Sequence, residues 1–235
     1  MKAVLPILFF FTCSSNSCSK KDYDTMPNPV AAKKYTYLAL GDSYTIGEMV
    51  APSDNFPSQV YSMMRNDTVD FLAPRIIART GWTTDELETG IINANNADPL
   101  PSSYDFVSLL IGVNNQYRGR TVDSYKPEFE ELLKKAIRYT GNRPERVVVL
   151  SIPDWGVTPF ANGRDRAQIA REIDAYNAAN KEITLRYNVN YIDITPWTRE
   201  AATDLTLVAN DGLHPSGKEY KRWAEAISSF FRTKL

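Results

Sequence analysis

The side chains best suited to chemistry in this sequence are one serine, one histidine and one aspartate. His214 is the only histidine among the 235 residues, so a reaction that needs an imidazole base must use it. Asp211 lies three residues earlier and can hold the imidazole in one tautomer and stabilise its charged form. The hydroxyl of Ser43 is a useful nucleophile only where such a base takes its proton. Together these residue types indicate acyl transfer.

Acyl transfer also needs hydrogen-bond donors for the oxyanion of its tetrahedral intermediate, each lowering the barrier by about 3 kcal/mol. We expect three donors: the backbone N–H of Ser43, the backbone N–H of Gly81 and the side-chain amide of Asn114. Gly81 has no side chain to block close approach of a ligand. Asn114 carries an uncharged NH2 donor, which a carboxylate does not have.

Four short blocks carry a resemblance to a known family: Gly41-Asp42-Ser43, Gly81, Gly112-x-Asn114 and Asp211-x-x-His214. In order and rough spacing they resemble the four blocks of the SGNH (GDSL-type) hydrolases, which include esterases, lysophospholipases, thioesterases and carbohydrate acetylesterases. The resemblance extends over about residues 37–223 and implies a flavodoxin-like fold. It also implies that Ser43 is the nucleophile, that His214 and Asp211 are the base and its partner, and that Gly81 and Asn114 complete the oxyanion hole.

Two positions depart from the family pattern. Tyr44 stands where the family name has leucine, at a position that varies widely in this family. Asn115 replaces the usual aspartate of Gly-x-Asn-Asp, which is a supporting residue in the family. The second change therefore puts the geometry of the loop in question more than the chemistry.

Apolar runs alternate with helical patterns along the chain after residue 34. The runs at 35–40, 75–79, 105–111, 146–152 and 191–194 predict strands, and the patterns at 55–65, 83–96, 165–186 and around 129–137 and 220–230 predict helices. Strands that are apolar on both faces and separated by helices are typical of a parallel sheet covered on both sides. We therefore predict one α/β domain, residues 35–235, with a three-layer, doubly wound fold and a five-stranded parallel sheet.

The loops after these strands are where a ligand is expected, because open sheets of this kind bind ligands beyond the carboxyl ends of their strands. Four large aromatic residues lie in or near such loops, namely Trp82, Tyr117, Trp155 and Phe160. They are candidates for substrate binding, with ordinary packing beneath the loops as the open alternative.

The N-terminus has the pattern of a targeting segment. Lys2 is followed by an apolar run, residues 3–12, that is too short for a bilayer, since a spanning helix takes about 20 apolar residues. We predict a signal peptide at 1–17 and a tether at 18–34. Cys18, or alternatively Cys13, resembles the lipidated cysteine of bacterial lipoproteins, although neither has the usual leucine three residues upstream. The predicted location is the cell envelope, by a lipid anchor, or otherwise the periplasm or medium.

Composition and motifs exclude several other classes. A net charge of −1 argues against a nucleic-acid partner. The body has one histidine and no cysteine, so we expect no metal, and it lacks the glycine-rich nucleotide motifs, so we expect no organic cofactor. The predicted function is a serine ester hydrolase acting on short-chain or carbohydrate O-acyl esters. A lysophospholipase or thioesterase, a non-catalytic binding protein and a flavodoxin-like cofactor binder remain alternatives.

Overall fold

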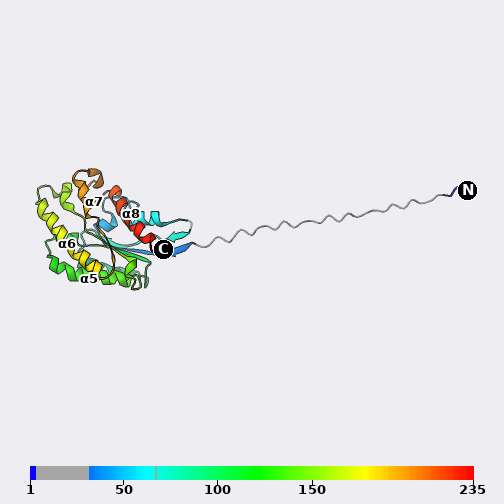
Figure 1. Cartoon of the computed structure of the whole chain (residues 1–235), viewed down its shortest axis with the longest axis horizontal. Helices are drawn as coiled ribbons and strands as arrows, with labels where there is room; N and C mark the ends of the chain where they lie inside the picture. The colour runs from blue at the N-terminus through cyan, green and yellow to red at the C-terminus, as the bar shows by residue number, and fades with distance from the viewer. Residues whose placement is uncertain (4–31, 67) are drawn as a thin grey trace. The chain divides into compact units, whose positions relative to one another are not determined.

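The computed structural model describes residues 1–3, 32–66 and 68–235 of the chain (Figure 1). Nearly all of the predicted signal peptide and tether, including Cys13 and Cys18, lies outside the described residues. Among the described residues, no helix has both the length and the apolar character needed to cross a membrane.

Five parallel strands form the central sheet in the order β4-β2-β5-β6-β7. They are β4 (Arg75–Arg79), β2 (Tyr37–Asp42), β5 (Phe106–Leu110), β6 (Val147–Leu150) and β7 (Asn190–Ile192). Numbered along the chain, these strands have the order 2-1-3-4-5 that is typical of flavodoxin-like folds. The predicted five-stranded, doubly wound α/β fold is confirmed.

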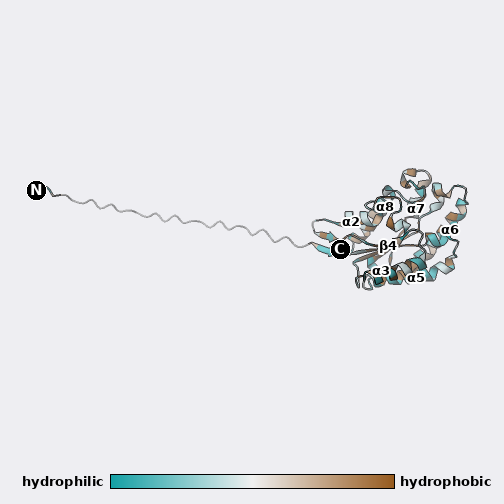
Figure 2. Cartoon of the chain, turned by 180° about the vertical axis from the view of Figure 1, so that it is seen from behind, coloured by the Kyte–Doolittle hydropathy of each residue, from teal (hydrophilic) through white to brown (hydrophobic). Residues whose placement is uncertain are grey.

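Helices cover both faces of this sheet. Figure 2 shows α2 (Phe56–Met64) and α8 (Gly217–Arg232) on one face, and α3 (Thr84–Ala97) and α5 (Val122–Arg138) on the other, where α6 (Arg166–Arg186) packs against α5. The shorter helices are α1 (Ser43–Ile46), α4 (Val113–Tyr117) and α7 (Thr195–Arg199), with 3-10 turns η1 (Pro144–Arg146), η2 (Trp155–Val157), η3 (Pro159–Ala161), η4 (Glu200–Ala202) and η5 (Leu205–Leu207).

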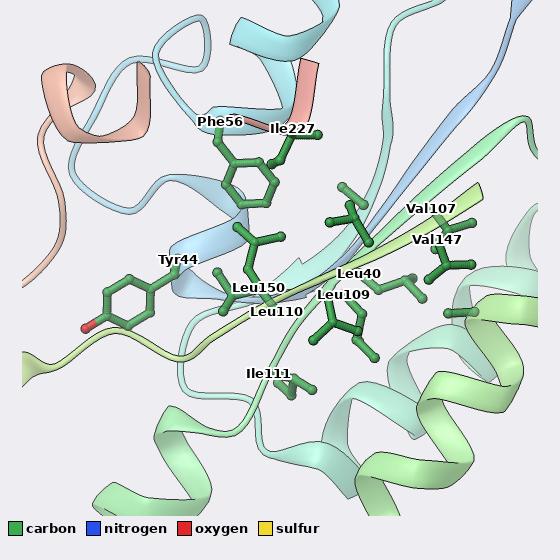
Figure 3. Close-up of a cluster of buried hydrophobic side chains, with 14 of the residues drawn as sticks. Leu40, Tyr44, Phe56, Val107, Leu109, Leu110, Ile111, Val147, Leu150 and Ile227 are labelled. Carbon is green, nitrogen blue, oxygen red and sulfur yellow. The ribbon is translucent and has the colours of Figure 1, made fainter. Parts of the chain in front are cut away.

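The two strands that lead into the site are mostly apolar and are buried along their whole length. Every residue of β2 and β5 is buried. Leu40 and Leu109 pack toward one helical layer, while Phe56 and Ile227 meet the sheet from the other (Figure 3). Burial on both faces fixes the strands firmly, and so it fixes the loops that follow them.

The first predicted strand differs from the observed one. Residues 35–40 belong to two strands, β1 (Lys33–Tyr35) and β2, and β1 pairs with β3 (Val69–Phe71), which the sequence did not predict. Thr36 separates the two strands, and its backbone N–H and hydroxyl both donate to the Asp105 carboxylate, at 2.8 and 2.9 Å. Strands of three residues are too short to leave a clear alternation in the sequence.

Candidate active site

Ser43, His214 and Asp211 form one hydrogen-bonded chain at the carboxyl ends of the strands. His214 Nε2 lies 3.0 Å from Ser43 Oγ, and His214 Nδ1 lies 2.6 Å from Asp211 Oδ2. Ser43 and His214 are 4% and 6% exposed, and their direct 3.0 Å contact leaves no room for a water between the hydroxyl and the imidazole. The structure thus brings together the three residues that the sequence singled out for acyl transfer.

The loop that carries His214 is closed by its own aspartate. Asp211 Oδ1 accepts the backbone N–H groups of Leu213 and His214, both at 3.0 Å, while Oδ2 holds the imidazole. Burial opposes the charge on Asp211, but the hydrogen bonds from the His214 ring and the two N–H groups outweigh it and lower the pKa of this carboxyl. An ionised Asp211 that is fixed in this way keeps the imidazole oriented toward Ser43.

Ser43 stands at the first position of α1, immediately after β2. The tight strand-to-helix turn depends on Gly41, since a Cβ there would lie 2.0 Å from Thr45 Oγ1 and 2.5 Å from the Leu110 carbonyl oxygen. Asp42 caps the helix by accepting the Tyr44 N–H at 3.0 Å. The Tyr44 ring packs against the imidazole, with 5.1 Å between the ring centroids, so the residue after the serine supports the histidine.

Asp42 is a buried carboxyl directly beneath the serine. It is 1% exposed, and burial raises its pKa to about 7 against the opposing hydrogen bonds from the Tyr44 N–H and the Asn114 amide. The Asn114 contact is long, with Nδ2 3.4 Å from Asp42 Oδ2. The sequence places Asp42 in the Gly41-Asp42-Ser43 block but does not predict that its carboxyl is buried.

The three predicted oxyanion donors line one cavity with the imidazole. This cavity of about 160 Å3 is bordered by Ser43, Gly81, Asn114 and His214, and its other walls are mostly apolar. Gly81 has φ +83°, a backbone conformation that favours glycine. The arrangement can present two backbone N–H groups to an oxygen bound beside Ser43, and the Asn114 amide can add a third donor when its long 3.4 Å contact with Asp42 is exchanged for that oxygen.

The loop after β4 is tied to α4 by side chains that are close together in the sequence. Asn114 Nδ2 donates to the Trp82 carbonyl at 3.0 Å, and Arg118 Nη2 donates to the Gly81 carbonyl at 2.7 Å. Arg118 also pairs with Glu86 of α3 at 3.1 Å. These contacts fix Gly81 relative to Asn114, and the sequence did not predict them.

Asn115, which stands where the family usually has aspartate, makes hydrogen bonds that suit a neutral amide. Its amide is fully buried, accepts the Thr84 N–H at 3.1 Å and donates to Thr84 Oγ1 at 2.7 Å. The Thr84 hydroxyl in turn donates to Glu128. A neutral amide suits this position because an ionised carboxylate has no hydrogen to donate to Thr84 Oγ1.

Three of the four aromatic candidates lie at the cavity. Tyr117, Trp155 and Phe160 line it, together with Leu213, which the sequence did not select for substrate binding. Trp82 does not line this cavity, because its indole packs on α3, where a Cβ at Gly90 would lie 2.1 Å from the ring. The sequence shows where Trp82 sits along the chain but not which way its side chain points.

Within residues 32–66 and 68–235, histidine, cysteine, aspartate and glutamate side chains form no group that could hold a metal ion.

Among solved structures, the fold is similar to a psychrotrophic esterase from Pseudoalteromonas sp., with a TM-score of 0.63 and 16% identity over 86% of this chain and 98% of that one. For an acetyl xylan esterase from Geobacillus stearothermophilus the TM-score is 0.61 and the identity 17%, over 83% of this chain and 94% of that one. For an extracellular lipase from Streptomyces rimosus the TM-score is 0.61 and the identity 17%, over 83% of this chain and 99% of that one.

No curated protein matches the sequence. Residues 39–222 match the GDSL-like lipase/acylhydrolase family, and this segment contains all four blocks identified in the sequence. The match spans most of the chain, and the fold is shared with structures of esterases and lipases. The protein therefore belongs to the GDSL-like lipase/acylhydrolase family of hydrolases.

Proposed function

We propose that the protein hydrolyses carboxylic esters through an acyl-enzyme on Ser43. The observation that carries this proposal is the chain of contacts from Ser43 Oγ through the His214 ring to Asp211, at 3.0 and 2.6 Å. A serine, a base within hydrogen-bond reach and a third group that orients the base are the requirements for an activated hydroxyl nucleophile.

In the proposed reaction, Ser43 Oγ attacks the ester carbonyl carbon while its proton moves to His214 Nε2. The backbone N–H groups of Ser43 and Gly81 and the amide of Asn114 bind the oxyanion of the tetrahedral intermediate. The bond to the alcohol oxygen then breaks, and the alcohol leaves with the proton from His214. Water gives a proton to His214 and attacks the acyl-enzyme, which releases the carboxylic acid and restores the serine hydroxyl.

Substitution of the serine and the histidine tests this proposal. We expect Ser43→Ala and His214→Ala each to lower kcat on p-nitrophenyl acetate by at least about 10³-fold. Circular dichroism and urea unfolding serve as controls for folding. Turnover close to wild type in Ser43→Ala contradicts the proposal, and a folded wild-type protein without turnover supports a binding protein instead.

Covalent labelling gives a second test. The similar esterase from Pseudoalteromonas sp. was solved in a form inhibited by monoethylphosphonate. We expect a fluorinated ethylphosphonate to lose fluoride and attach to Ser43 of this chain, with peptide mass spectrometry locating the adduct. His214→Ala should label far more slowly, because the serine then lacks its base. Labelling at another residue contradicts the role of Ser43.

The size of the cavity favours a short acyl group. Its volume of about 160 Å3 is below the roughly 300–1,000 Å3 of pockets for drug-sized ligands. We therefore propose acetate or butyrate esters rather than the long acyl chains of a lysophospholipase or a long-chain thioesterase. A series from acetate to palmitate, all with one leaving group, measures this preference. Highest kcat/KM on octanoate or palmitate favours the lipid alternative.

We also propose export of the protein and lipid attachment at Cys18, with Cys13 as the alternative, on the basis of the sequence alone. Acylated cysteine would anchor the chain stably where it carries more than one acyl chain. Membrane fractionation of Cys18→Ala and Cys13→Ala tests the assignment. Release into the soluble fraction by only one of them identifies the modified residue, and release by neither contradicts lipid attachment.

A further inference from the structure

A second cavity adjoins the active-site cavity and is much more polar. It has a volume of about 290 Å3, and Tyr117 and Trp155 belong to the walls of both cavities. Its remaining walls include Arg164 and three residues at the start of α6 or on its first turns, Gln168, Ile169 and Glu172. The two cavities therefore lie on either side of these two rings, which places the second cavity next to the one that contains Ser43.

Glu172 supplies hydrogen-bond acceptors to this second cavity. Its Oε1 accepts the Gln168 amide at 2.7 Å, and its Oε2 accepts the Gln116 amide at 2.6 Å. Gln116 is held in turn by the Trp155 indole N–H, which donates to Gln116 Oε1 at 2.8 Å. Each carboxylate oxygen has a further lone pair, so Glu172 can accept from a ligand hydroxyl without breaking these bonds.

Arg164 supplies donors on the same cavity. Its guanidinium lies 5.3, 5.5 and 5.6 Å from the ring centroids of Tyr117, Trp155 and Phe160, and Nη2 donates to the Tyr117 hydroxyl at 3.3 Å. Within the part of the chain that the structure describes, no ion pair includes Arg164. Contact with the aromatic rings fixes the guanidinium in place, and most of its five N–H donors remain available to a ligand.

The hydrogen-bond donors and acceptors that line the second cavity favour one kind of alcohol in the ester over others. A phosphate would meet Arg164 but also the carboxylates of Asp165 and Glu172, which line the same cavity. An alkyl chain would cover the polar groups of Arg164, Gln168 and Glu172 without replacing their bonds to water. A sugar ring offers hydroxyls that donate and accept, and its C–H faces can pack on the Tyr117 ring, which belongs to a residue that is 45% exposed.

We propose that the second cavity is the alcohol subsite of the enzyme and that it binds a neutral sugar ring whose acylated hydroxyl points toward Ser43. The proposal rests on the proposed ester hydrolysis for its role in catalysis, although sugar binding itself does not depend on catalysis. It names Arg164, Gln168 and Glu172 as the residues that distinguish a carbohydrate ester from other esters. The cavity, slightly under the roughly 300 Å3 at the low end of ligand pockets, suits a single ring.

Three acetate esters that differ only in the alcohol test the subsite. They are methyl 6-O-acetyl-glucoside, hexyl acetate and acetylated glycerol 3-phosphate, assayed with the wild type, Arg164→Gln and Gln168→Ala. We expect the wild type to have its highest kcat/KM on the sugar ester. Each variant should lower the ratio of kcat/KM on the sugar ester to that on hexyl acetate by about tenfold, the effect of about 1.4 kcal/mol of lost binding. Arg171→Gln, an exposed position on α6 outside both cavities, is the matched control.

A binding measurement separates the subsite from the chemistry. Calorimetry with methyl glucoside, which has no ester, should give a Kd that rises about tenfold in Arg164→Gln and Gln168→Ala and stays the same in Arg171→Gln. An unchanged specificity ratio or an unchanged Kd in both subsite variants overturns the sugar proposal, as does a preference for hexyl acetate or the phosphate ester. Absence of all ester hydrolysis with sugar binding intact contradicts the proposed function but not the sugar site.

Discussion

Two sides of the active-site cavity are held by different kinds of contact. The oxyanion side, residues 80–84 with 112–118, is joined by hydrogen bonds. Asn114 and Arg118 donate to carbonyls of the loop after β4, and Asn115 accepts from the Thr84 N–H at the start of α3. The aromatic side, residues 153–168, meets the cavity through the rings of Trp155 and Phe160, with Arg164 stacked above them. Directional bonds fix atoms to within tenths of an ångström, whereas ring contacts tolerate small shifts.

We expect the oxyanion side to affect mainly kcat and the aromatic side to affect mainly KM. Oxyanion stabilisation requires donors at about 2.7–3.1 Å from the place where charge develops, so small errors on the oxyanion side lower kcat. Binding of a leaving group tolerates more variation, so changes on the aromatic side should mainly raise KM. Three predictions test the comparison and one tests the buried carboxyl next to Ser43, in order from the largest expected effect to the smallest.

Loss of the Asn114 amide should show the largest effect. We expect Asn114→Ala to lower kcat on p-nitrophenyl acetate by about 10²–10³-fold with little change in KM, because the donor acts mainly in the transition state. Steady-state kinetics measures the effect, and Asn93→Ala, an exposed position on α3, is the control. A loss of less than about fivefold would remove Asn114 from the oxyanion hole.

Asn115 tests whether the oxyanion side depends on a neutral amide. In Asn115→Asp, we expect the free energy of unfolding to fall by about 3 kcal/mol at pH 8, because an ionised carboxylate would be buried beside Thr84 and near Glu128. Burial should raise the pKa of the introduced carboxyl, so the loss should shrink toward pH 5, where the protonated form can donate as the amide does. Urea unfolding measures both values.

Glu128, which accepts the hydrogen bond of the Thr84 hydroxyl, supplies the control for the Asn115 prediction. Glu128→Gln alone should cost little, and combined with Asn115→Asp it should recover part of the stability lost at pH 8, because one negative charge is removed from the network. The expectation fails if Asn115→Asp is equally stable at both pH values.

Asp42 tests how much the buried carboxyl beneath Ser43 costs the folded state. Burial raises its pKa to about 7, whereas a free aspartate has a pKa of about 3.9, so between these values the unfolded chain releases a proton that the folded chain keeps. Its contribution therefore makes the protein less stable as pH rises from about 4 to 7. We expect Asp42→Asn to flatten this dependence, changing the stability difference from wild type by roughly 2 kcal/mol between pH 5 and 7.

Unfolding by urea at pH 5, 6 and 7 checks the Asp42 prediction. Asp70→Asn, on the outlying strand β3, is the control, since that side chain is only partly buried and lies away from the site. Parallel curves for Asp42→Asn and wild type would mean that Asp42 does not keep its proton in the folded protein.

Strand ends explain which parts of the site the sequence could predict. Ser43 follows β2 directly and Asn114 follows β5 after three residues, and both strands are buried, so their placement can be predicted from the strand pattern and from the rule that such loops meet at one edge of the sheet. Asp211 and His214 are three residues apart, and a short loop can bring them together. Each of these positions depends on local sequence and on the topology of the sheet.

The contacts that depend on side-chain direction could not be predicted in this way. Trp82 turns onto Gly90 of α3, while Arg118 reaches back to the Gly81 carbonyl. The first outcome depends on the side-chain conformation of Trp82 and the second on how α4 packs beside the loop after β4, and no local pattern contains either. The same holds for Phe160, whose η3 segment is brought to the site by the bond from its N–H to the Gly212 carbonyl at 2.9 Å.

Phe160 gives the smallest expected effect and tests the aromatic side directly. It is 40% exposed and contacts Tyr117 and Trp155 only through their rings, at centroid distances of 6.2 and 5.9 Å. We expect Phe160→Ala to raise KM on acetate esters about threefold, to change kcat less, and to lower the free energy of unfolding by about 1 kcal/mol or less. Leu185→Ala, an exposed position on α6, is the control for loss of apolar surface alone. A fall in kcat comparable to that of Asn114→Ala would mean that the aromatic side also positions the reacting atoms, because a residue that only binds the substrate stabilises the ground state and the transition state equally.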